Sequence, residues 1–321
     1  MTPENLSVVE IQKVYKNNYR KIIGEFMNIQ SEFLSGIYNR YDKDLDAANI
    51  VLFFAKNLHQ DTLRLRDSDL NVDISFNNFW NNHSKIRQKN FKIISIAKET
   101  GLPKETTRRK INNLIKNKML EKQKNSVSWK PVEKHKDSYN KIVTEELKQI
   151  SKLIQVICVH LNITFSREKI ADELKKYYSF YWYHYLSVQL QYIKFWQEKL
   201  NDLEMLLIGL QTTIQTLNHL NRKSENGYLI NPKAHKEFDL KDANISATSV
   251  SEVTGIPRAT CIRKLDKFVK MKVLDKDSVS KRYFLKLNQT TLNPMLDQDW
   301  LKQKISILSD FSSIVMRGLF R

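Results

Sequence analysis

Long stretches of the chain place apolar residues three or four positions apart, the spacing of one helix face. The stretches DSYNKIVTEELKQISKLIQVI and DQDWLKQKISILSDFSSIVM each follow a shorter, more basic segment. Short runs typical of β-hairpins occur at 119–130 and 273–287. With seven glycines and six prolines in 321 residues, turn-forming residues are scarce. We therefore expect a mainly α fold with small β-hairpins.

An internal repeat organises the chain. Shifted by 154 positions, SIAKETGLPKETTRRKINNLIKNKMLEK (from Ser95) aligns with SVSEVTGIPRATCIRKLDKFVKMKVLDK (from Ser249), with 11 identities in 28 ungapped positions. Upstream, DLDAANIVLFF (from Asp44) resembles DLEMLLIGL (from Asp202) more loosely. The repeat predicts two units, 1–162 and 163–321. Two Asn- and Asp-rich inserts, 61–90 and 222–244, are weakly periodic, and the sequence leaves their role open.

In the first copy, residues 91–117 predict two helices separated by a tight turn. Gly101 permits a positive φ at the turn, and Leu102 is expected to be buried between the helices. Pro103 is expected at the first position of the second helix. The apolar face of that helix consists of Thr107, Ile111 and Leu114, and the opposite face of Lys104, Glu105, Thr106, Arg108, Arg109 and Asn112. Residues 245–271 predict the same arrangement in the second copy.

A basic hairpin is expected after each pair of helices. The segment 119–130 predicts two short strands with a turn at Lys124–Asn125, and the segment 273–287 predicts a hairpin with Lys281 and Arg282 where the chain leaves its tip. A helix-turn-helix followed by such a hairpin is a winged helix. The sequence therefore predicts two winged-helix units, joined by long helices.

The charge of the chain favours a polyanionic partner. The 53 Lys and Arg residues exceed the 35 Asp and Glu residues by 18, and both repeat copies are rich in cations. In a major groove, Arg reads guanine and Asn reads adenine, while Thr contacts phosphate or a thymine methyl. We expect double-stranded DNA to be contacted by Lys104, Thr106, Arg108, Arg109, Asn112, Lys122 and Lys124 and by Arg258, Thr260, Arg263, Lys264, Lys276, Lys281 and Arg282.

The motif GLPKETTRRKINNLIKNKMLEK, set between long helices, resembles the winged helix of the MarR family of bacterial regulators. Family members are homodimers with interleaved terminal helices, so the resemblance implies that this chain fuses two such protomers into a pseudo-dimer. It also implies that a DNA-reading helix carries Thr106, Arg108 and Arg109 in the first copy and Thr260, Ile262 and Arg263 in the second. The family's Asp-x-Arg wing signature is absent, and Arg282 would take its role. Lys118 and Lys272 stand where such helices usually end on a left-handed glycine.

Other function classes lack sequence support. Cys158 and Cys261 form no CxxC or Cys/His cluster, which argues against a zinc site or a disulfide framework and for a reduced, cytoplasmic setting. We expect no cofactor, no metal and no enzymatic site, because no nucleophile-base set, phosphate loop or carboxylate pair is evident. The apolar stretch from Tyr177 to Ile193 falls short of a membrane span. Its helical spacing favours a packed core or a seam between the two units, although the resemblance also implies a small-molecule effector near the helices.

The leading hypothesis is a sequence-specific transcriptional regulator that places two recognition helices in successive major grooves. It acts as a single-chain pseudo-dimer or as a homodimer. Because Arg108 corresponds to Ile262, we expect an asymmetric operator. One alternative is a plasmid or phage replication initiator with two winged helices. The other is a winged-helix assembly or scaffold protein that does not bind DNA.

Overall fold

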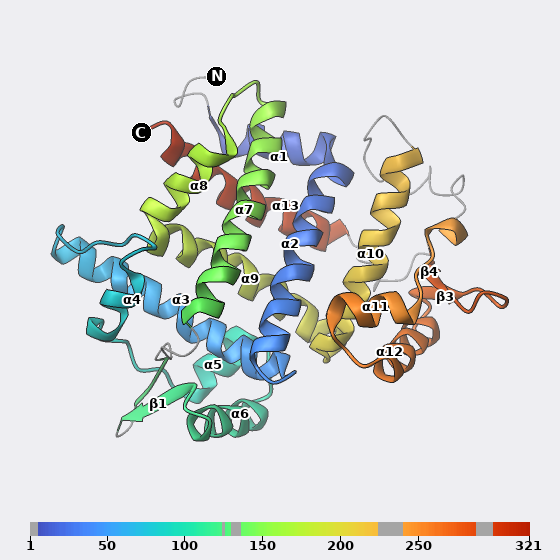
Figure 1. The fold of residues 1–321 in the computed structure, drawn as a ribbon, viewed down its shortest axis with the longest axis horizontal. Coiled ribbons are helices and arrows are strands. Elements are labelled where there is room, and N and C mark those ends of the chain that lie inside the picture. Colours follow the sequence, from blue (N-terminus) through green and yellow to red (C-terminus); the bar gives the residue numbers. More distant parts are fainter. Residues whose placement is uncertain (1–5, 124–125, 130–135, 224–239, 287–297) are drawn as a thin grey trace. The chain divides into compact units, whose positions relative to one another are not determined.

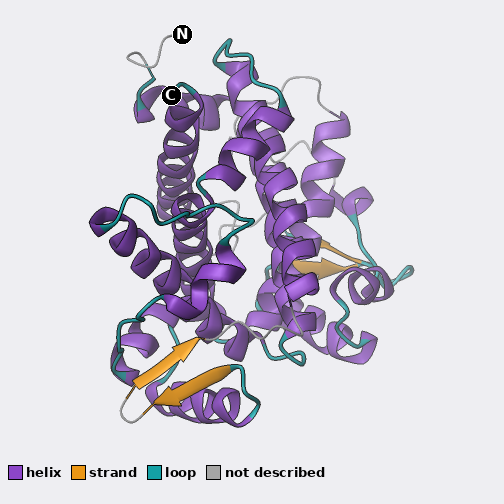
Figure 2. Cartoon of the chain, turned by 60° about the vertical axis from the view of Figure 1, so that its left-hand side comes forward, coloured by secondary structure: helices purple, strands orange, loops and turns teal. Residues whose placement is uncertain are grey.

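A computed structural model describes residues 6–123, 126–129, 136–223, 240–286 and 298–321 of the chain. This part of the protein is mainly helical, with strands that form two small antiparallel sheets of two strands each. The strands are orange in Figure 2. The expectation of a mainly α protein with small β-hairpins is therefore confirmed.

The chain divides into two compact units. Figure 1 labels most of their helices and strands. Unit 1 comprises Met1–Lys43, Val156–Thr164 and Asp202–Ser313, and unit 2 comprises Asp44–Gln155, Phe165–Asn201 and Ile314–Arg321. Each unit therefore combines segments from both halves of the sequence. The division at 162/163 describes the repeat along the chain, whereas packing groups the helices differently.

Unit 2 is built around the pairing of two long helices, α3 and α9. Its elements are α3 (Leu45–Ser68), α4 (Phe79–Asn82), η2 (His83–Lys85), α5 (Ile93–Thr100), α6 (Lys104–Lys116), β1 (Leu120–Gln123), β2 (Ser126–Trp129), most of α7 (Lys136–His160), α8 (Arg167–Lys176) and α9 (Tyr178–Leu200).

Unit 1 is built in the same way around α2 and α10. Its elements are α1 (Val8–Asn17), α2 (Tyr19–Arg40), α10 (Leu203–Lys223), η5 (Leu240–Ala243), α11 (Ala247–Thr254), α12 (Arg258–Lys270), β3 (Leu274–Lys276), β4 (Tyr283–Leu285) and most of α13 (Gln298–Leu319).

The two long-helix pairs cross over between the repeat copies. The helix α2 comes from the first half of the sequence, yet it packs along α10 from the second half within unit 1. The helix α9 comes from the second half and packs along α3 from the first half within unit 2. Each of these helices packs against a partner from the other half of the sequence, so the core of each unit combines residues from both halves.

The aromatic helix α9 belongs to the core of unit 2. Its buried rings include Tyr178, Trp182 and Trp196. Tyr178 meets His59 of α3 edge to face at a centroid distance of 5.2 Å and donates or accepts a hydrogen bond with Tyr139 of α7. The interpretation of this helix as a packed core is confirmed. Among the described residues, no helix combines the length and the apolar character that crossing a membrane requires.

The insert at 61–90 is more ordered than its weak periodicity indicates. Its first eight residues continue α3 to Ser68, and α4 and η2 follow. Phe79 and Trp80 are buried, and Phe79 stacks on Tyr139 of α7 at a centroid distance of 5.5 Å. Two aromatic side chains thus tie this insert to the core of unit 2. Of the second insert, 222–244, residues 224–239 lie outside the described part of the chain.

Candidate nucleic-acid interface

Each unit carries one helix–turn–helix–hairpin segment, here called a head. The first head consists of α5, α6, β1 and β2 in unit 2, and the second head of α11, α12, β3 and β4 in unit 1. In the hairpins, Leu120 lies opposite Trp129 and Leu274 opposite Leu285. All these elements fall inside the ranges 91–117, 119–130, 245–271 and 273–287 expected from the sequence.

A glycine sets the turn between the two helices of each head. Gly101 has a φ of 72° and Gly255 a φ of 71°, in the left-handed region that side chains disfavour. A Cβ on Gly101 would also lie 3.3 Å from Cγ of Lys194, and one on Gly255 would lie 3.2 Å from Oδ1 of Asn39. Both backbone geometry and close approach of a neighbouring helix therefore favour glycine at these two positions.

The second helix of each head buries one face and exposes the other. Pro103 precedes α6 as its N-cap, one residue before the expected position, and Leu102 is buried as expected. The buried face of α6 consists of Thr107, Ile111 and Leu114, and that of α12 of Cys261, Lys264, Leu265 and Phe268. Burial of these side chains determines which residues of each helix face solvent.

Both helices end in the same left-handed turn, made by a lysine. Lys118 has a φ of 58° and Lys272 a φ of 59°. After α6, the Met119 amide donates to the Leu114 carbonyl and the Lys118 amide to the Ile115 carbonyl, the two hydrogen bonds of a Schellman motif. The second copy repeats this pattern. The left-handed turn is thus kept although the usual glycine is absent.

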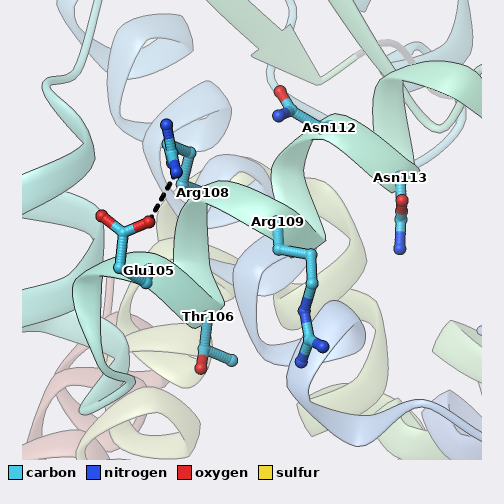
Figure 3. A pocket seen from close by; sticks show the side chains of 6 residues that line it. All are labelled: Glu105, Thr106, Arg108, Arg109, Asn112 and Asn113. Atoms are coloured by element: carbon cyan, nitrogen blue, oxygen red, sulfur yellow. Dashed lines mark ion pairs between the residues drawn. The ribbon is translucent and has the colours of Figure 1, made fainter.

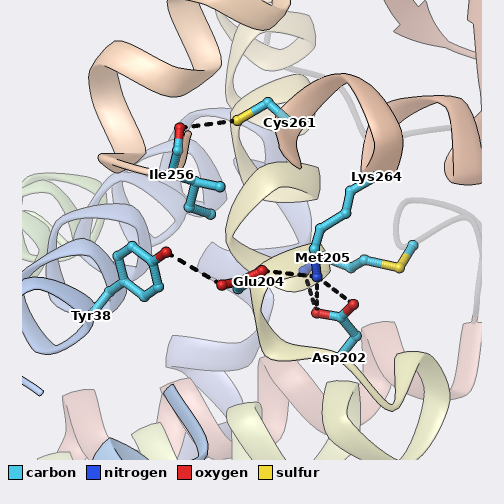
Figure 4. Close-up of polar contacts among 7 residues, drawn as sticks. All are labelled: Tyr38, Asp202, Glu204, Met205, Ile256, Cys261 and Lys264. Carbon is cyan, nitrogen blue, oxygen red and sulfur yellow. Dashed lines mark hydrogen bonds and ion pairs between the residues drawn. The ribbon is translucent and has the colours of Figure 1, made fainter. Parts of the chain in front are cut away.

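A lysine on each of these helices is anchored to the unit that carries it. In unit 1, Lys264 is only 6% exposed and forms ion pairs with Asp202 and with Glu204, the latter at 2.9 Å (Figure 4). In unit 2, the equivalent Lys110 forms an ion pair with Asp44. The expectation that Lys264 contacts DNA is corrected here, because its ammonium is buried and already paired.

A tyrosine extends the anchor of the second head. Tyr38 of α2 donates its phenol proton to Glu204 at 3.3 Å (Figure 4). Burial, followed by the charge of Glu204, raises the pKa of Tyr38 to about 12, so the phenol stays protonated at neutral pH. The α12 helix is thus tied by Lys264 and Glu204 to both long helices of unit 1.

The exposed face of α6 forms an open hollow of about 700 Å³ (Figure 3). Arg108 lies there in an exposed ion pair with Glu105 at 2.7 Å. Arg109 and Asn112 are exposed one helical turn apart, without a partner among the described residues. The hollow is lined by Glu105, Thr106, Arg108, Arg109, Asn112 and Asn113. Five of the six offer side-chain donors, so the hollow suits acceptors such as phosphate or base edges.

The remaining cations expected for the first head flank this hollow in sequence. Lys104 opens α6 and Lys122 lies in β1, and both side chains are exposed without a partner among the described residues. Lys124, expected at the hairpin turn, lies outside the described residues. The described part of the first head thus presents Lys104, Thr106, Arg108, Arg109, Asn112 and Lys122 at its surface.

In the second head, an acidic residue ties the helix to the hairpin. Asp266 of α12 accepts hydrogen bonds from Lys276 of β3 and from the phenol of Tyr283 of β4, both at 2.9 Å. Burial opposes its ionisation, but the hydrogen bonds from Lys276 and Tyr283 lower the pKa of Asp266. Hydrogen bonds to Tyr283 and Asp266 in turn raise the pKa of Lys276. Lys276 is therefore engaged within the head.

Three further cations of the second head also have partners within it. Arg258 donates to the Thr248 hydroxyl at 3.0 Å, and Arg282 donates to Oδ1 of Asn244 at 3.1 Å. Lys281 donates to a backbone carbonyl of its own hairpin. All three remain exposed, so these weak contacts do not remove them from the surface. Arg263 is exposed without a described partner, and Thr260 is half-buried.

Sequence reasoning missed the residues that engage these cations. The alignment of Asp44 with Asp202 and of Lys110 with Lys264 was the available signal for the anchors, because the two pairs recur together. Nothing in the sequence indicated that Asp266 and Tyr283 meet, since a single acidic residue on a basic helix face is equally compatible with solvent exposure. Their pairing depends on how β4 returns beside α12.

The described part of the arrangement offers hydrogen-bond donors and positive charge on the exposed faces of α6 and α12. Among the described residues, no group of three or more His, Cys, Asp or Glu is placed to hold a metal ion. Cys158 and Cys261 are both free and buried. Exposed guanidinium and amide groups next to a basic hairpin are suited to binding a polyanion.

Comparison with family models, curated proteins and solved structures finds no match to this chain.

Proposed function

We propose that this protein is a sequence-specific regulator of transcription that binds double-stranded DNA through two winged helices. In this proposal, α6 and α12 act as recognition helices in successive major grooves, and the two hairpins lie near the phosphate backbone. The chain provides both heads and acts as a pseudo-dimer in the cytoplasm, either alone or as a homodimer.

The observation that carries the proposal is the exposed face of α6. The buried Thr107, Ile111 and Leu114 turn Arg109 and Asn112 outward, one helical turn apart and close to the N-terminal half of the helix. A recognition helix contacts base edges from that half. Arg and Asn are also the side chains that hydrogen-bond guanine and adenine most specifically in the major groove.

The charge distribution supports a DNA partner independently of this face. The whole chain carries a formal net charge of +18, and in the first head Lys104, Arg109 and Lys122 have no described partner. Neutralising a phosphate with such a cation releases condensed counterions, which favours binding at low salt. We therefore expect binding that weakens steeply as salt rises.

The experiment is selection of bound sequences from a pool of random DNA duplexes by the purified full chain. The proposal predicts an enriched motif, and predicts that the affinity for the selected duplex falls on a log–log plot against salt with a slope of about −0.9 for each phosphate contacted. Single strands of the same sequence serve as the control. Failure to retain any duplex at 50 to 100 mM salt, roughly where the cationic term is strong, would contradict the proposal.

Mapping the bound sites in the source genome then distinguishes the two DNA-binding roles. A regulator of transcription is expected at sites upstream of several genes, and removing the protein should change the transcription of those genes. Confinement of binding to one array of repeated sequences, with no change in transcription, would instead indicate a replication initiator.

A further inference from the structure

The two heads differ in how many of their donors are already used. In the second head, Lys264 and Lys276 pair with acidic residues, and Arg258 and Arg282 hydrogen-bond to neighbouring side chains. In the first head, Lys104, Arg109 and Lys122 have no partner among the described residues. The first head also has engaged cations, Arg108 and Lys110, and Arg263 of the second head has no described partner, so the two heads differ at particular positions of the repeat.

The sharpest difference lies at one position of the repeat. Asn112 of α6 corresponds to Asp266 of α12. The amide of Asn112 is exposed and can donate and accept at once, as pairing with an adenine edge requires. The carboxylate of Asp266 cannot donate, and it is already bonded to Lys276 and Tyr283. An adenine contact is thus open to the first head and closed to the second.

A second position of the repeat, four residues before Asn112, shows the same contrast between the heads. Arg108 of α6 is 63% exposed in its ion pair with Glu105, whereas the corresponding Ile262 of α12 is half-buried. An exposed ion pair of this kind contributes little energy, so Arg108 is free to exchange Glu105 for a base or a phosphate. Ile262 has no hydrogen-bonding group and offers at most an apolar contact with a thymine methyl.

We infer that the first head sets most of the sequence preference and that the second head mainly holds the phosphate backbone. Arg109 and Asn112, three positions apart on one face, would read a guanine and a neighbouring adenine. The second head would contribute cations that position the chain and, through Arg263, at most one guanine contact. The DNA target would then have one well-defined half-site and one tolerant half-site. This inference rests on the proposed function.

The test compares equivalent substitutions in the two heads. Selection from random duplexes is run with the wild-type chain, Asn112→Ala and Asp266→Ala. We expect Asn112→Ala to erase the preference at one adenine and to weaken binding to the wild-type motif about tenfold or more. Asp266→Ala should leave every base preference unchanged, because the carboxylate it removes reads no base.

A transplant variant tests the same claim by gain of function. Ile262→Arg with Asp266→Asn gives α12 the groove-facing residues of α6 at these two positions. The inference predicts that a second half-site with a resolved base preference appears in the selected motif. A further measurement needs no variant. It compares the affinity of the wild-type chain for its selected duplex when one or the other half-site is randomised. Randomising the defined half-site should cost at least tenfold more than randomising the other.

The outcomes separate the inference from the proposed function. Loss of all duplex binding by the wild-type chain contradicts the proposed function itself. A wild-type motif with two equally defined half-sites, or an equal loss of preference in Asn112→Ala and Asp266→Ala, overturns the inference and leaves duplex binding intact. Circular dichroism spectra and thermal unfolding of each variant show whether a lost preference reflects lost folding.

Discussion

The ammonium of Lys264 lies 2.9 Å from a carboxylate oxygen of Glu204 and also pairs with Asp202, the residue that precedes α10. The lysine lies on the buried side of α12, together with Cys261, Leu265 and Phe268, and is itself nearly fully buried. A charge at this position fixes the orientation of α12 on α10. The first repeat copy uses Lys110 and Asp44 in the same way, so the anchor belongs to the repeat.

Replacing Lys264 with Met should destabilise unit 1, because it leaves Asp202 and Glu204 close together without a cation. Both carboxylates are about a quarter exposed, which moderates the loss to about 2 kcal/mol. Lys110→Met is the matched change in unit 2, where the lysine is 18% exposed and has a single partner. Denaturant unfolding should show the larger loss for Lys264→Met, and equal losses would contradict this ranking.

The turn glycine of the first head is expected to resist substitution. Gly101→Ala places a Cβ at a φ of 72° and 3.3 Å from Lys194, and it should lower the free energy of unfolding by about 1 kcal/mol or more. Gly24→Ala is the control, because Gly24 lies inside α2, where a Cβ meets only an ordinary contact at 3.8 Å. That change should be stabilising by about 0.5 to 1 kcal/mol. Thermal unfolding that shifts both variants in the same direction would refute the argument.

A buried histidine should make unit 2 sensitive to acid. Burial lowers the pKa of His59 to about 3, whereas an unfolded histidine titrates near 6.5. Below pH 6.5 the unfolded state therefore binds a proton that the folded state does not, and the free energy of unfolding decreases as the pH falls toward 3. His59→Leu removes this dependence. Its stability relative to the wild type should rise by about 1 kcal/mol between pH 7 and pH 5.5, and a constant difference between the two proteins would contradict the assignment.

A buried lysine should make the stability of unit 1 increase with pH in the alkaline range. Burial lowers the pKa of Lys304 to about 7, well below its usual value of 10.5. Between pH 7 and 10.5 the unfolded state binds the extra proton, so stability rises with pH across this window. Lys304→Met should be more stable than the wild type at pH 7, by about 1 kcal/mol or more. This advantage should shrink toward pH 10, and an advantage that stays constant would argue against a neutral lysine.

The local structure of the heads could be predicted from the sequence, because residues close together in the sequence determine it. Gly101 and Gly255 marked the turns, and the spacing of Thr107, Ile111 and Leu114 marked the buried face of α6. The paired strands also lie within the two short segments, 119–130 and 273–287, that predicted hairpins. In these cases a few neighbouring residues determine the conformation, so one sequence is sufficient.

Long-range packing did not follow in the same way. The pairing of α2 with α10 and of α9 with α3 depends on which of several similar apolar faces meet, and helical periodicity is the same for every pairing. The burial of Lys264 likewise depends on carboxylates that lie some 60 positions away in the sequence. Because these carboxylates are distant in the sequence, Lys264 was expected at the surface and was assigned to the DNA interface.

The most direct test of the DNA-binding proposal is the affinity of Arg109→Ala/Arg263→Ala for the duplex selected by the wild-type chain. The account predicts a loss of roughly 100-fold, since each guanidinium is expected to contribute about 1–3 kcal/mol. Lys13→Ala/Lys148→Ala removes the same charge from α1 and α7, outside both heads, and should bind within about threefold of the wild type. Equal affinities of the two double variants for that duplex would contradict the account.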